Sequence, residues 1–414
     1  MRVFYSISVW LYVFFVHVAT LWNPKAKQWV QGRRESLQKL EDFQTQNSSL
    51  VTPDSLLTGY KIYWFHCASL GEFEQGRPLI EALKNSESCK IMLTFFSPSG
   101  YEIRKNYELA DVILYLPIDS KKNAKRFFDL VKPDKVFFIK YEFWANYIFE
   151  AEKRKIPFYS ISAVFRKDQV FFKWYGGFMR SILKSITTIF VQDEASKKLL
   201  ESIEIKSTVS GDTRYDRVLN NAKSAQRFEL IDDFTKDHKI LVCGSVWSED
   251  LKVISNGINQ LENNWKIIIA PHEIKETNLD EIERHFRSKK LVRYSQLDNE
   301  NNDAKILFID NIGMLMHLYG YGNLAYVGGA FKTGLHNILE PASFGLPVIF
   351  GPHHKKFPEA ELFIQNGIGF SISNEQEFNA VLNHLKAADL HSKVIQFMNS
   401  KTGATKTIMR IIFS

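Results

Sequence analysis

The sequence is poor in the residues that build metal and redox centres. Of its 414 residues only three are cysteines, Cys67, Cys89 and Cys243, and none of them forms a Cys-x-x-Cys motif. This scarcity argues against a disulfide framework or a zinc knuckle and suits a reducing compartment. An Asp-x-Asp pair is absent as well. We therefore predict no metal site and no bound cofactor.

Two common nucleotide-binding signatures are also missing. The chain contains neither Gly-x-x-x-x-Gly-Lys-Ser/Thr nor Gly-x-Gly-x-x-Gly, which argues against P-loop ATPases and dinucleotide-dependent enzymes. No arginine-rich tract is present, so we expect no nucleic acid as a partner. The formal net charge of +7 favours other anionic partners, either an acidic lipid surface or a phosphorylated substrate.

Charge is lacking from one long stretch near the N-terminus. Residues 3–22 contain no Asp, Glu, Lys or Arg, and about 20 apolar residues are enough to span a bilayer as a helix. Lys25, Lys27, Arg33 and Arg34 follow, which places the rest of the chain in the cytoplasm. We predict a membrane-associated helix that either spans the bilayer or lies in its interface. A helix packed on the protein itself is the alternative.

Further along, apolar runs of strand length alternate with segments of helical period. The runs lie near 61–66, 90–95, 112–116, 135–139, 157–161 and 187–191, and again at 239–244, 266–271, 305–309, 323–329 and 346–351. This alternation predicts an α/β fold with two Rossmann-like, doubly wound domains that face a cleft.

The domain boundaries follow from breaks in this pattern. We predict an anchor helix and basic flank at 1–34, a first domain at 35–215 that opens with a polar tether at 35–58, a linker at 216–238, a second domain at 239–390, and a C-terminal helix at 391–414 that packs back on the first domain.

Glu72 is the strongest catalytic candidate in the first half. It follows the strand at 61–66 after a small-residue turn, so it lies at the carboxyl end of a central strand. A carboxylate there can take a proton from an attacking hydroxyl. The alternative is an ordinary acidic residue at a helix N-terminus, stabilised by the helix dipole by about 0.3–1 kcal/mol and holding a lowered pKa.

Two further strand ends in the first half carry candidate substrate contacts. Ser99 and Gly100 follow the run at 90–95, and Glu142 follows the run at 135–139 beside Lys140. The alternatives are a plain helix cap for the serine turn and an acidic helix N-terminus for Glu142.

In the second half, the stretch from Asn323 to Gly351 predicts a strand, a glycine turn at Gly328-Gly329, a helix N-terminus and another strand. Such a turn lets main-chain N–H groups approach a phosphate, and Glu340 one helical turn further can hold a ribose diol. His336 and Asn337 are candidates for the same site.

Other strand ends of the second half add weaker candidates. Ser245 could hydrogen-bond a phosphate, and His272 could contact a phosphate or stack on a base. The main chain around Gly313 could read a base edge, and Lys332 could pair with a phosphate. Solvated loop residues are the alternative for His272 and Lys332.

Taken in order, these motifs resemble the 3-deoxy-D-manno-octulosonic acid (Kdo) transferases of lipopolysaccharide synthesis. The resemblance covers nearly the whole chain, and it is carried by the turn ending in Gly71-Glu72, Ser99-Gly100, Glu142-Phe143-Trp144, Gly211 to Asp216, Gly244-Ser245, Pro271-His272, Ile312-Gly313-Met314, Val327-Gly328-Gly329 and His336 to Pro341. The last block is the most specific of them.

The resemblance implies a GT-B fold and an inverting, metal-independent transfer of Kdo. It implies a CMP-Kdo donor held by the second domain and a lipid A precursor, lipid IVA, held by the first. The enzyme would work at the cytoplasmic leaflet of the cell inner membrane.

The family's residue roles also carry over to positions of this chain. Its general base falls on Glu72, and Ser245 becomes a partner of the donor phosphate. Its CMP-contacting segments fall on Pro271, His272, Ile312, Gly313, Met314, Asn337, Ile338, Leu339 and Glu340. Many relatives carry an arginine where His272 stands, and the loop after Gly329 is less rich in glycine and arginine than theirs.

Three other readings stay open at this point. The first is another GT-B enzyme that uses a UDP-sugar. The second is a membrane-tethered nucleotide-binding protein without catalysis. The third and weakest is a hydrolase that uses His66 and Cys67.

Overall fold

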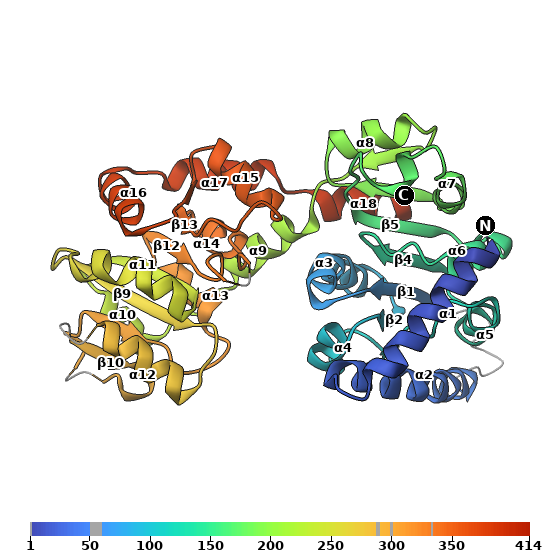
Figure 1. Ribbon diagram of the computed structural model, residues 1–414, viewed down its shortest axis with the longest axis horizontal. Helices are drawn as coiled ribbons and strands as arrows, with labels where there is room; N and C mark the ends of the chain where they lie inside the picture. Colours follow the sequence, from blue (N-terminus) through green and yellow to red (C-terminus); the bar gives the residue numbers. More distant parts are fainter. Residues whose placement is uncertain (1, 50–59, 287–289, 299–300, 333) are drawn as a thin grey trace. The chain divides into compact units, whose positions relative to one another are not determined.

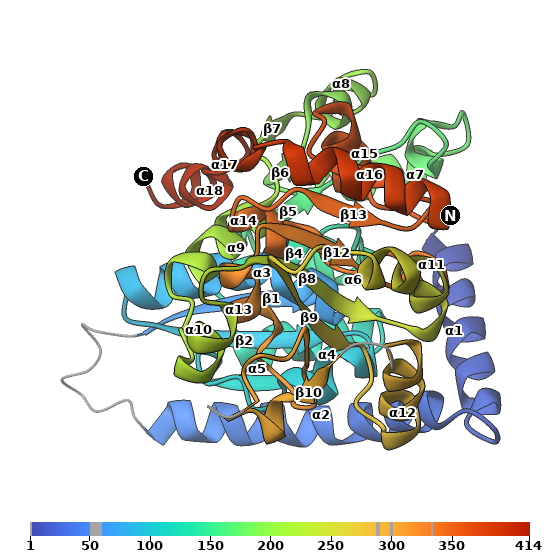
Figure 2. The same ribbon diagram turned by 90° about the vertical axis from the view of Figure 1, so that its left-hand side faces the viewer.

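The protein folds as two compact units, each built around one parallel sheet (Figure 1, with a second view in Figure 2). The computed structural model describes residues 2–49, 60–286, 290–298, 301–332 and 334–414. The first unit comprises Met1–Asp216 together with Gly403–Ser414, and the second comprises Arg217–Thr402.

The first unit contains a seven-stranded sheet in the order β3-β2-β1-β4-β5-β6-β7, with every neighbouring pair parallel. Its strands are β1 (Lys61–Cys67), β2 (Cys89–Phe95), β3 (Val112–Tyr115), β4 (Lys135–Ile139), β5 (Phe158–Ala163), β6 (Thr188–Val191) and β7 (Ser207–Val209). The strand order reverses between β1 and β4. Ligands of such sheets bind outside the carboxyl ends of the strands at that reversal.

Helices cover both faces of this sheet. The face that carries Trp64 and Phe138 packs on α2 (Pro24–Ser49), α5 (Lys121–Val131), α6 (Ala145–Lys153), α7 (Gly177–Lys184) and α8 (Glu194–Glu201). The opposite face, with Phe65 and Phe137, packs on α3 (Leu70–Ser86), α4 (Pro98–Arg104) and α18 (Ala404–Phe413). Neighbouring residues of one strand thus serve different cores, as the two-residue repeat of a strand requires.

The N-terminal segment forms two helices: one lies within the expected anchor, and the other covers the basic flank and part of the expected tether. Helix α1 (Arg2–Ala19) is followed by α2, which contacts β3 and α5. The expected tether was wrong for residues 35–49, because Leu40 and Phe43 of α2 are buried in the core of the first unit. The remainder of that segment, 50–58, lies outside the described residues.

Helix α1 is fixed to the first unit by one of its sides. The Tyr5 hydroxyl donates to Asp119 Oδ2 at 2.5 Å, and its ring contacts Phe178. The Tyr12 ring contacts the rings of Trp29 and Phe96. Among the described helices, no single one is long and apolar enough to cross a membrane; α1 and α2 meet the length and composition only as a pair, with a bend of 119° between them.

The second unit contains the other seven-stranded sheet, in the order β10-β11-β9-β8-β12-β13-β14, again all parallel. Its strands are β8 (Lys239–Val246), β9 (Trp265–Pro271), β10 (Leu291–Arg293), β11 (Ile306–Phe308), β12 (Leu324–Val327), β13 (Val348–Phe350) and β14 (Gly369–Ser371). Here the strand order reverses between β8 and β12.

The helices of the second unit also divide between two faces. One face packs on α11 (Ser248–Asn259), α12 (Glu276–His285) and α16 (Glu375–Ala387). The other packs on α10 (Glu229–Thr235), α13 (Leu315–Leu318) and the 3-10 turn η4 (Tyr319–Tyr321). The remaining helices are α14 (Leu339–Ser343), α15 (Pro358–Gln365) and α17 (His391–Ser400).

Two of the expected boundaries differ in the structure. The segment 216–238 is not a free linker: it contains most of α9 (Thr213–Lys223) and all of α10, whose Ile231 and Phe234 are fully buried under the second sheet. The segment 391–414 holds two helices instead of one. Helix α17 belongs to the second unit and α18 to the first, where Asp216 accepts hydrogen bonds from the Gly403 and Thr405 main-chain N–H groups at 2.6 Å each.

Candidate active site

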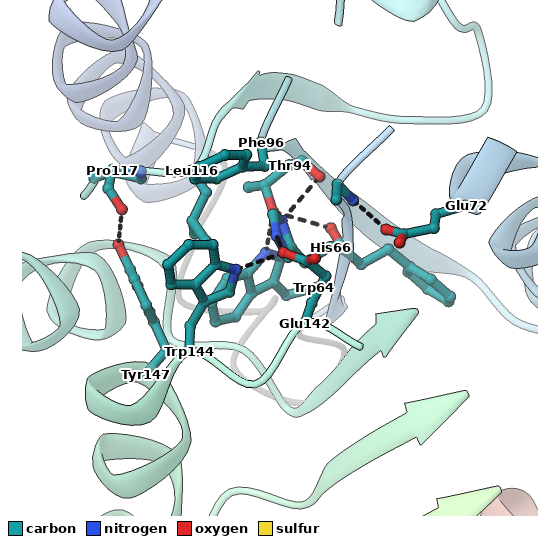
Figure 3. Close-up of polar contacts among 12 residues, drawn as sticks. Trp64, His66, Glu72, Thr94, Phe96, Leu116, Pro117, Glu142, Trp144 and Tyr147 are labelled. Atoms are coloured by element: carbon teal, nitrogen blue, oxygen red, sulfur yellow. Dashed lines mark hydrogen bonds and ion pairs between the residues drawn. The ribbon is translucent and has the colours of Figure 1, made fainter. Parts of the chain in front are cut away.

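Two carboxylates stand at the point where the strand order of the first sheet reverses. Glu72 lies in the first turn of α3, directly after β1, and Glu142 lies in the turn after β4. Strands β1 and β4 are neighbours, so the two acids come from the same edge of the sheet (Figure 3).

Glu72 is largely buried and holds its proton unusually well. Its Oε2 accepts a hydrogen bond of 2.5 Å from the Ala68 main-chain N–H. Burial and the charge of Glu142 raise the pKa of Glu72 to about 8, against the opposing influence of that N–H group and of Lys140. The lowered pKa expected for a plain helix-terminal acid is therefore wrong. A carboxyl group with a pKa near working pH suits general-base catalysis.

Glu142 is held by a chain of hydrogen bonds that runs back into the sheet (Figure 3). Trp144 Nε1 donates to Glu142 Oε2 at 2.6 Å, and His66 Nε2 lies 3.2 Å from the same oxygen. His66 itself is fully buried. Two donors on one oxygen fix the carboxylate in place beside the loop that carries Glu72.

The Nε2 proton of His66 is placed by Glu142. A carboxylate can only accept a hydrogen bond, so His66 Nε2, 3.2 Å from Glu142 Oε2, is the donor. The other ring nitrogen, Nδ1, lies 2.8 Å from the Thr94 hydroxyl and 3.2 Å from the Thr94 carbonyl oxygen.

Cys67 cannot act with His66 as a nucleophile and its base. The two are consecutive residues of β1, so their side chains point to opposite faces of the sheet. Cys67 is fully buried, and burial raises the pKa of its thiol well above the usual range. The thiol acts as a packing group, which removes the hydrolase reading.

Ser99 and Gly100 lie beside the loop that carries Glu72. The Ser97 N–H donates to the Ala68 carbonyl at 2.8 Å, and the Ser97 and Ser99 hydroxyls lie 2.8 Å apart. A Cβ on Gly100 would lie 2.4 Å from the Phe95 ring, so only glycine allows this close approach. Ser99 therefore remains a candidate substrate contact, whereas Gly100 has a packing role.

In the second unit, Asp250 joins the two turns that flank the reversal of the sheet. Its Oδ2 accepts from the main-chain N–H groups of Trp247, at 2.8 Å, and Gly329, at 3.0 Å. Its Oδ1 accepts from the Tyr326 hydroxyl at 2.7 Å. The turn after β8 and the glycine turn after β12 are thereby fixed to each other. Sequence reasoning missed Asp250, although an acid in the first turn of α11 was a signal for capping.

Gly329 has a backbone conformation that other residues rarely adopt. Its φ is +94°, and a Cβ there would lie 2.6 Å from both the Gly334 carbonyl oxygen and the His336 ring. Gly334 and His336 therefore lie close against Gly329. The predicted glycine turn is present, and its first glycine is needed as well, because a Cβ on Gly328 would lie 2.4 Å from the Ser245 carbonyl oxygen.

Three rings stack at this edge of the second sheet. The ring centroids of Trp247 and His272, and of His272 and His336, are each 4.4 Å apart. Trp247 Nε1 donates to His336 Nε2 at 3.2 Å, which leaves the His336 proton on Nδ1. Burial and His272 lower the pKa of His336 to about 4, and burial lowers the pKa of His272. His336 is therefore neutral at pH 7 and offers a hydrogen bond instead of a charge.

Glu340, the residue predicted to hold a ribose, lies beside Asn337, another candidate for the same site. Asn337 Nδ2 donates to Glu340 Oε1 at 3.0 Å, while Asn337 Oδ1 accepts from the Leu339 N–H at 3.1 Å. Burial raises the pKa of Glu340, and Asn337 and Arg217 act in the opposite direction. A fixed carboxylate of this kind can accept hydrogen bonds from a diol.

The other residues predicted to contact the CMP of the donor differ in whether their side chains are accessible. Ile312 is 91% exposed and Gly313 has open space around it, whereas the Met314 side chain is buried. Ile338 and Leu339 have buried side chains as well, so only their main chain is left for a ligand.

Ser245, Pro271 and Lys332 complete the predicted set. Ser245 has a φ of +55° at the end of β8, and Pro271 ends β9 next to the ring stack. Lys332 forms a salt bridge of 3.0 Å with Glu249 and lies over the Trp247 ring. Its charge is thus already engaged by a carboxylate.

Comparison with solved structures defines the class of the fold. UDP-GlcNAc 2-epimerase from Neisseria meningitidis matches with a TM-score of 0.59 at 16% identity, over 85% of this chain and 99% of that one. MurG from Acinetobacter baumannii matches with a TM-score of 0.55 at 12% identity, over 85% and 99%. The two Rossmann-like units therefore have the architecture of GT-B proteins.

Comparison by sequence finds relatives of one kind. Residues 33–217 match the family described as 3-deoxy-D-manno-octulosonic-acid transferase (kdotransferase). The 3-deoxy-D-manno-octulosonic acid transferase of Aquifex aeolicus is 27% identical over 339 residues, which cover 80% of this chain and 88% of that protein. The resemblance to the Kdo transferases is confirmed, and these findings support a Kdo glycosyltransferase.

Proposed function

We propose that the protein transfers Kdo from CMP-Kdo to the lipid A precursor lipid IVA, with inversion and without a metal ion. The observation that carries this proposal is Glu72, a carboxyl group with a pKa of about 8 at the reversal of the first sheet, in a chain that resembles Kdo transferases over most of its length.

The proposed step balances as a simple displacement. Glu72 accepts the proton of a sugar hydroxyl on the lipid. The freed oxygen forms a bond to the anomeric carbon of Kdo, the bond from that carbon to the phosphate oxygen breaks, and CMP leaves with the electron pair. Glu142 and its hydrogen-bonded chain keep Glu72 basic enough to take the proton.

The donor proposal rests on the second unit. Asn337 and Glu340 offer a fixed carboxylate to the ribose, and Ser245 offers a hydroxyl to the phosphate. His336 is neutral at pH 7, so the phosphate is met by hydrogen-bond donors and not by an imidazolium. A single phosphate carries less charge than a diphosphate and needs less compensation.

A comparison of CMP with UDP separates the proposed function from that of a UDP-sugar enzyme. We expect CMP to bind the purified full chain in calorimetry and to inhibit Kdo transfer, and UDP to do neither at the same concentration. The variant Glu340→Gln should weaken CMP binding about tenfold, since it removes the charge from the hydrogen bonds to the ribose. Binding of UDP in preference to CMP would instead support a UDP-sugar enzyme.

A location on the cytoplasmic leaflet of the inner membrane is part of the proposal. The outer side of α1 exposes Phe4, Trp10, Phe14 and Phe15 to 52–75%, while its inner side is fixed to the first unit. Such a helix suits a position in the plane of the interface, and the basic residues after it suit anionic lipid.

Membrane binding can be tested by flotation with vesicles that contain anionic lipid. We expect the full chain to float with the vesicles and the double variant Trp10→Ser/Phe14→Ser to remain largely at the bottom. Ile411→Ser is the matched control, since Ile411 is a 41% exposed apolar residue on α18 and should not affect flotation. Equal loss in both variants would speak against α1 as the contact.

A further inference from the structure

A crevice runs between α1, α2 and the segment that follows β3. Its inner, narrow part is lined by Val9, Tyr12 and Val13 of α1, by Trp29 of α2, and by residues that follow the strands: Phe96, Leu116, Pro117, Ile118, Asp119 and Trp144. Its outer part is a cleft of about 250 Å³ lined by His17, Trp29, Val30, Arg33, Arg34, Pro117, Ile118 and Asn123. Trp29 belongs to both parts.

The outer part is basic and has a buried cation in its wall. Arg33 is only 8% exposed, and it donates to the Leu116 carbonyl at 3.0 Å and the Phe96 carbonyl at 2.9 Å while it lies over the Trp29 ring. No carboxylate of the described residues forms an ion pair with it, and burial lowers its pKa to about 9. A buried charge of this kind is stabilised by an anion. Arg34, next in the chain, is exposed at the same cleft.

Trp29 supplies a second, independent sign of a ligand. Trp29 is only 5% exposed, yet its indole Nε1 has no hydrogen-bond partner. A buried N–H group without an acceptor is unfavourable by about 1–3 kcal/mol. An anionic or ester oxygen bound in the cleft would satisfy it.

The inner part ends at Trp144 and Asp119 and has the opposite polarity. Trp144, which lines it, donates to Glu142 and stacks on Phe96 with ring centroids 5.0 Å apart. Asp119 at the same end has an oxygen, Oδ1, without a partner. A phosphate would be repelled there, and with a volume of only about 10 Å³ the inner part has no room for a sugar. The ligand therefore lies in the outer cleft, with its phosphate at Arg34.

We propose that this crevice binds the phosphate-bearing sugar end of the lipid acceptor, with the phosphate at Arg33, Arg34 and the Trp29 N–H group. The inference rests on the proposed function for the identity of the acceptor, and on the crevice itself for the chemistry of the ligand. It assigns to α1 and α2 a direct part in acceptor binding.

The test measures binding without the donor, so that it does not depend on transfer. The full chain is titrated with mixed micelles that contain phosphatidic acid, with micelles that contain diacylglycerol instead, and with inorganic phosphate alone. We expect tight binding only of the phosphatidic acid micelles. Arg34→Gln and Trp29→Phe should each weaken that binding about tenfold.

Two controls keep the result decisive. Lys27→Gln removes one exposed charge from the same helix outside the crevice, so it should lose only the general attraction to an anionic surface and weaken binding clearly less than Arg34→Gln. Trp29→Phe removes part of a buried ring, so its binding is measured well below its melting temperature, and Arg34→Gln at an exposed position supplies the result that lost packing cannot explain. Three results would each overturn the proposal. Arg34→Gln and Lys27→Gln could weaken binding equally, diacylglycerol micelles could bind as tightly as phosphatidic acid micelles, or inorganic phosphate alone could bind as tightly as the lipid.

In a transfer assay the same variants should raise the KM for lipid IVA and leave that for CMP-Kdo unchanged. If no transfer occurs with any variant while micelle binding still depends on Arg34, the proposed function fails and the binding site stands. If transfer occurs but Arg34→Gln changes neither micelle binding nor the acceptor KM, the function stands and the site fails.

Discussion

Replacement of Glu72 by glutamine should lower the rate of Kdo transfer by about 100- to 10 000-fold, the usual contribution of a general base. The amide cannot accept the acceptor's proton, but its oxygen can still accept the hydrogen bond from the Ala68 N–H group. The affinity for CMP should not change, because the predicted donor residues all lie in the second unit. A variant that retains more than about one tenth of the activity would contradict the assignment.

The stability of the same variant provides an internal control on folding. The pKa of Glu72 is about 8 in the folded protein and 4.5 ordinarily, so the folded state binds more protons than the unfolded state between these values. Stability from this group is present at low pH and is lost as pH rises toward 8. Glu72→Gln has no carboxyl group at this position, so its stability does not fall in this way as pH rises. We therefore expect its melting temperature at pH 8 to equal or exceed that of the wild type.

Neutralising Glu142 should move the pH profile of transfer. Activity rises with pH as Glu72 loses its proton, with a midpoint near pH 8. Glu142→Gln removes the negative charge that opposes this ionisation, so the pKa of Glu72 falls and the midpoint moves to lower pH. The plateau should also drop, because a carboxylate with a lower pKa is a weaker base. The measurement is kcat/KM against pH from 5 to 10.

Lys140→Gln is the matched control for that shift. The ammonium group of Lys140 lowers the pKa of Glu72, so its removal should move the midpoint in the opposite direction, to higher pH. Shifts of opposite sign from two neighbouring substitutions cannot be explained by a general loss of structure. Shifts of the same sign, or no shift in Glu142→Gln, would contradict the coupling between the two acids.

The long strands were predictable because buried parallel strands are continuous apolar runs. KIYWFHC at β1 and KIIIAP at β9 leave little choice of structure. The short edge strands β7, β10 and β14 were not predicted, since three residues of mixed polarity give no pattern. Helix α2 was read as a tether because its composition is polar. Its few apolar residues, such as Leu40 and Phe43, show their role only once the sheet is in place.

Candidate site residues next to the end of a strand or the start of a helix were predictable from the sequence. Their partners from distant parts of the chain were not. Glu72, Glu142 and Glu340 were found because each comes just after a strand or in the first turn of a helix. The partners that determine their chemistry come from distant parts of the sequence. His66 reaches Glu142 across 76 positions, and Asp250 reaches Gly329 across 79. The pKa of Glu72 likewise depends on burial and on Glu142, which no local pattern of residues contains.

The crevice beneath α1 escaped sequence reasoning for a related reason. Arg33 and Arg34 were read only as a basic flank, and Trp29 carries no motif. The structure separates two adjacent arginines into a buried one and an exposed one. This difference arises because α2 packs along the first unit and presents only one of its sides to the sheet.

The most direct test of the account is the mass of the lipid product. Purified full chain is incubated with CMP-Kdo and tetra-acylated lipid IVA in detergent and a chelator, and the lipid is weighed by mass spectrometry. The account predicts a gain of one or more Kdo residues that persists without a divalent metal and is lost in Glu72→Gln. A lipid of unchanged mass, under conditions in which the Aquifex aeolicus transferase modifies it, would contradict it.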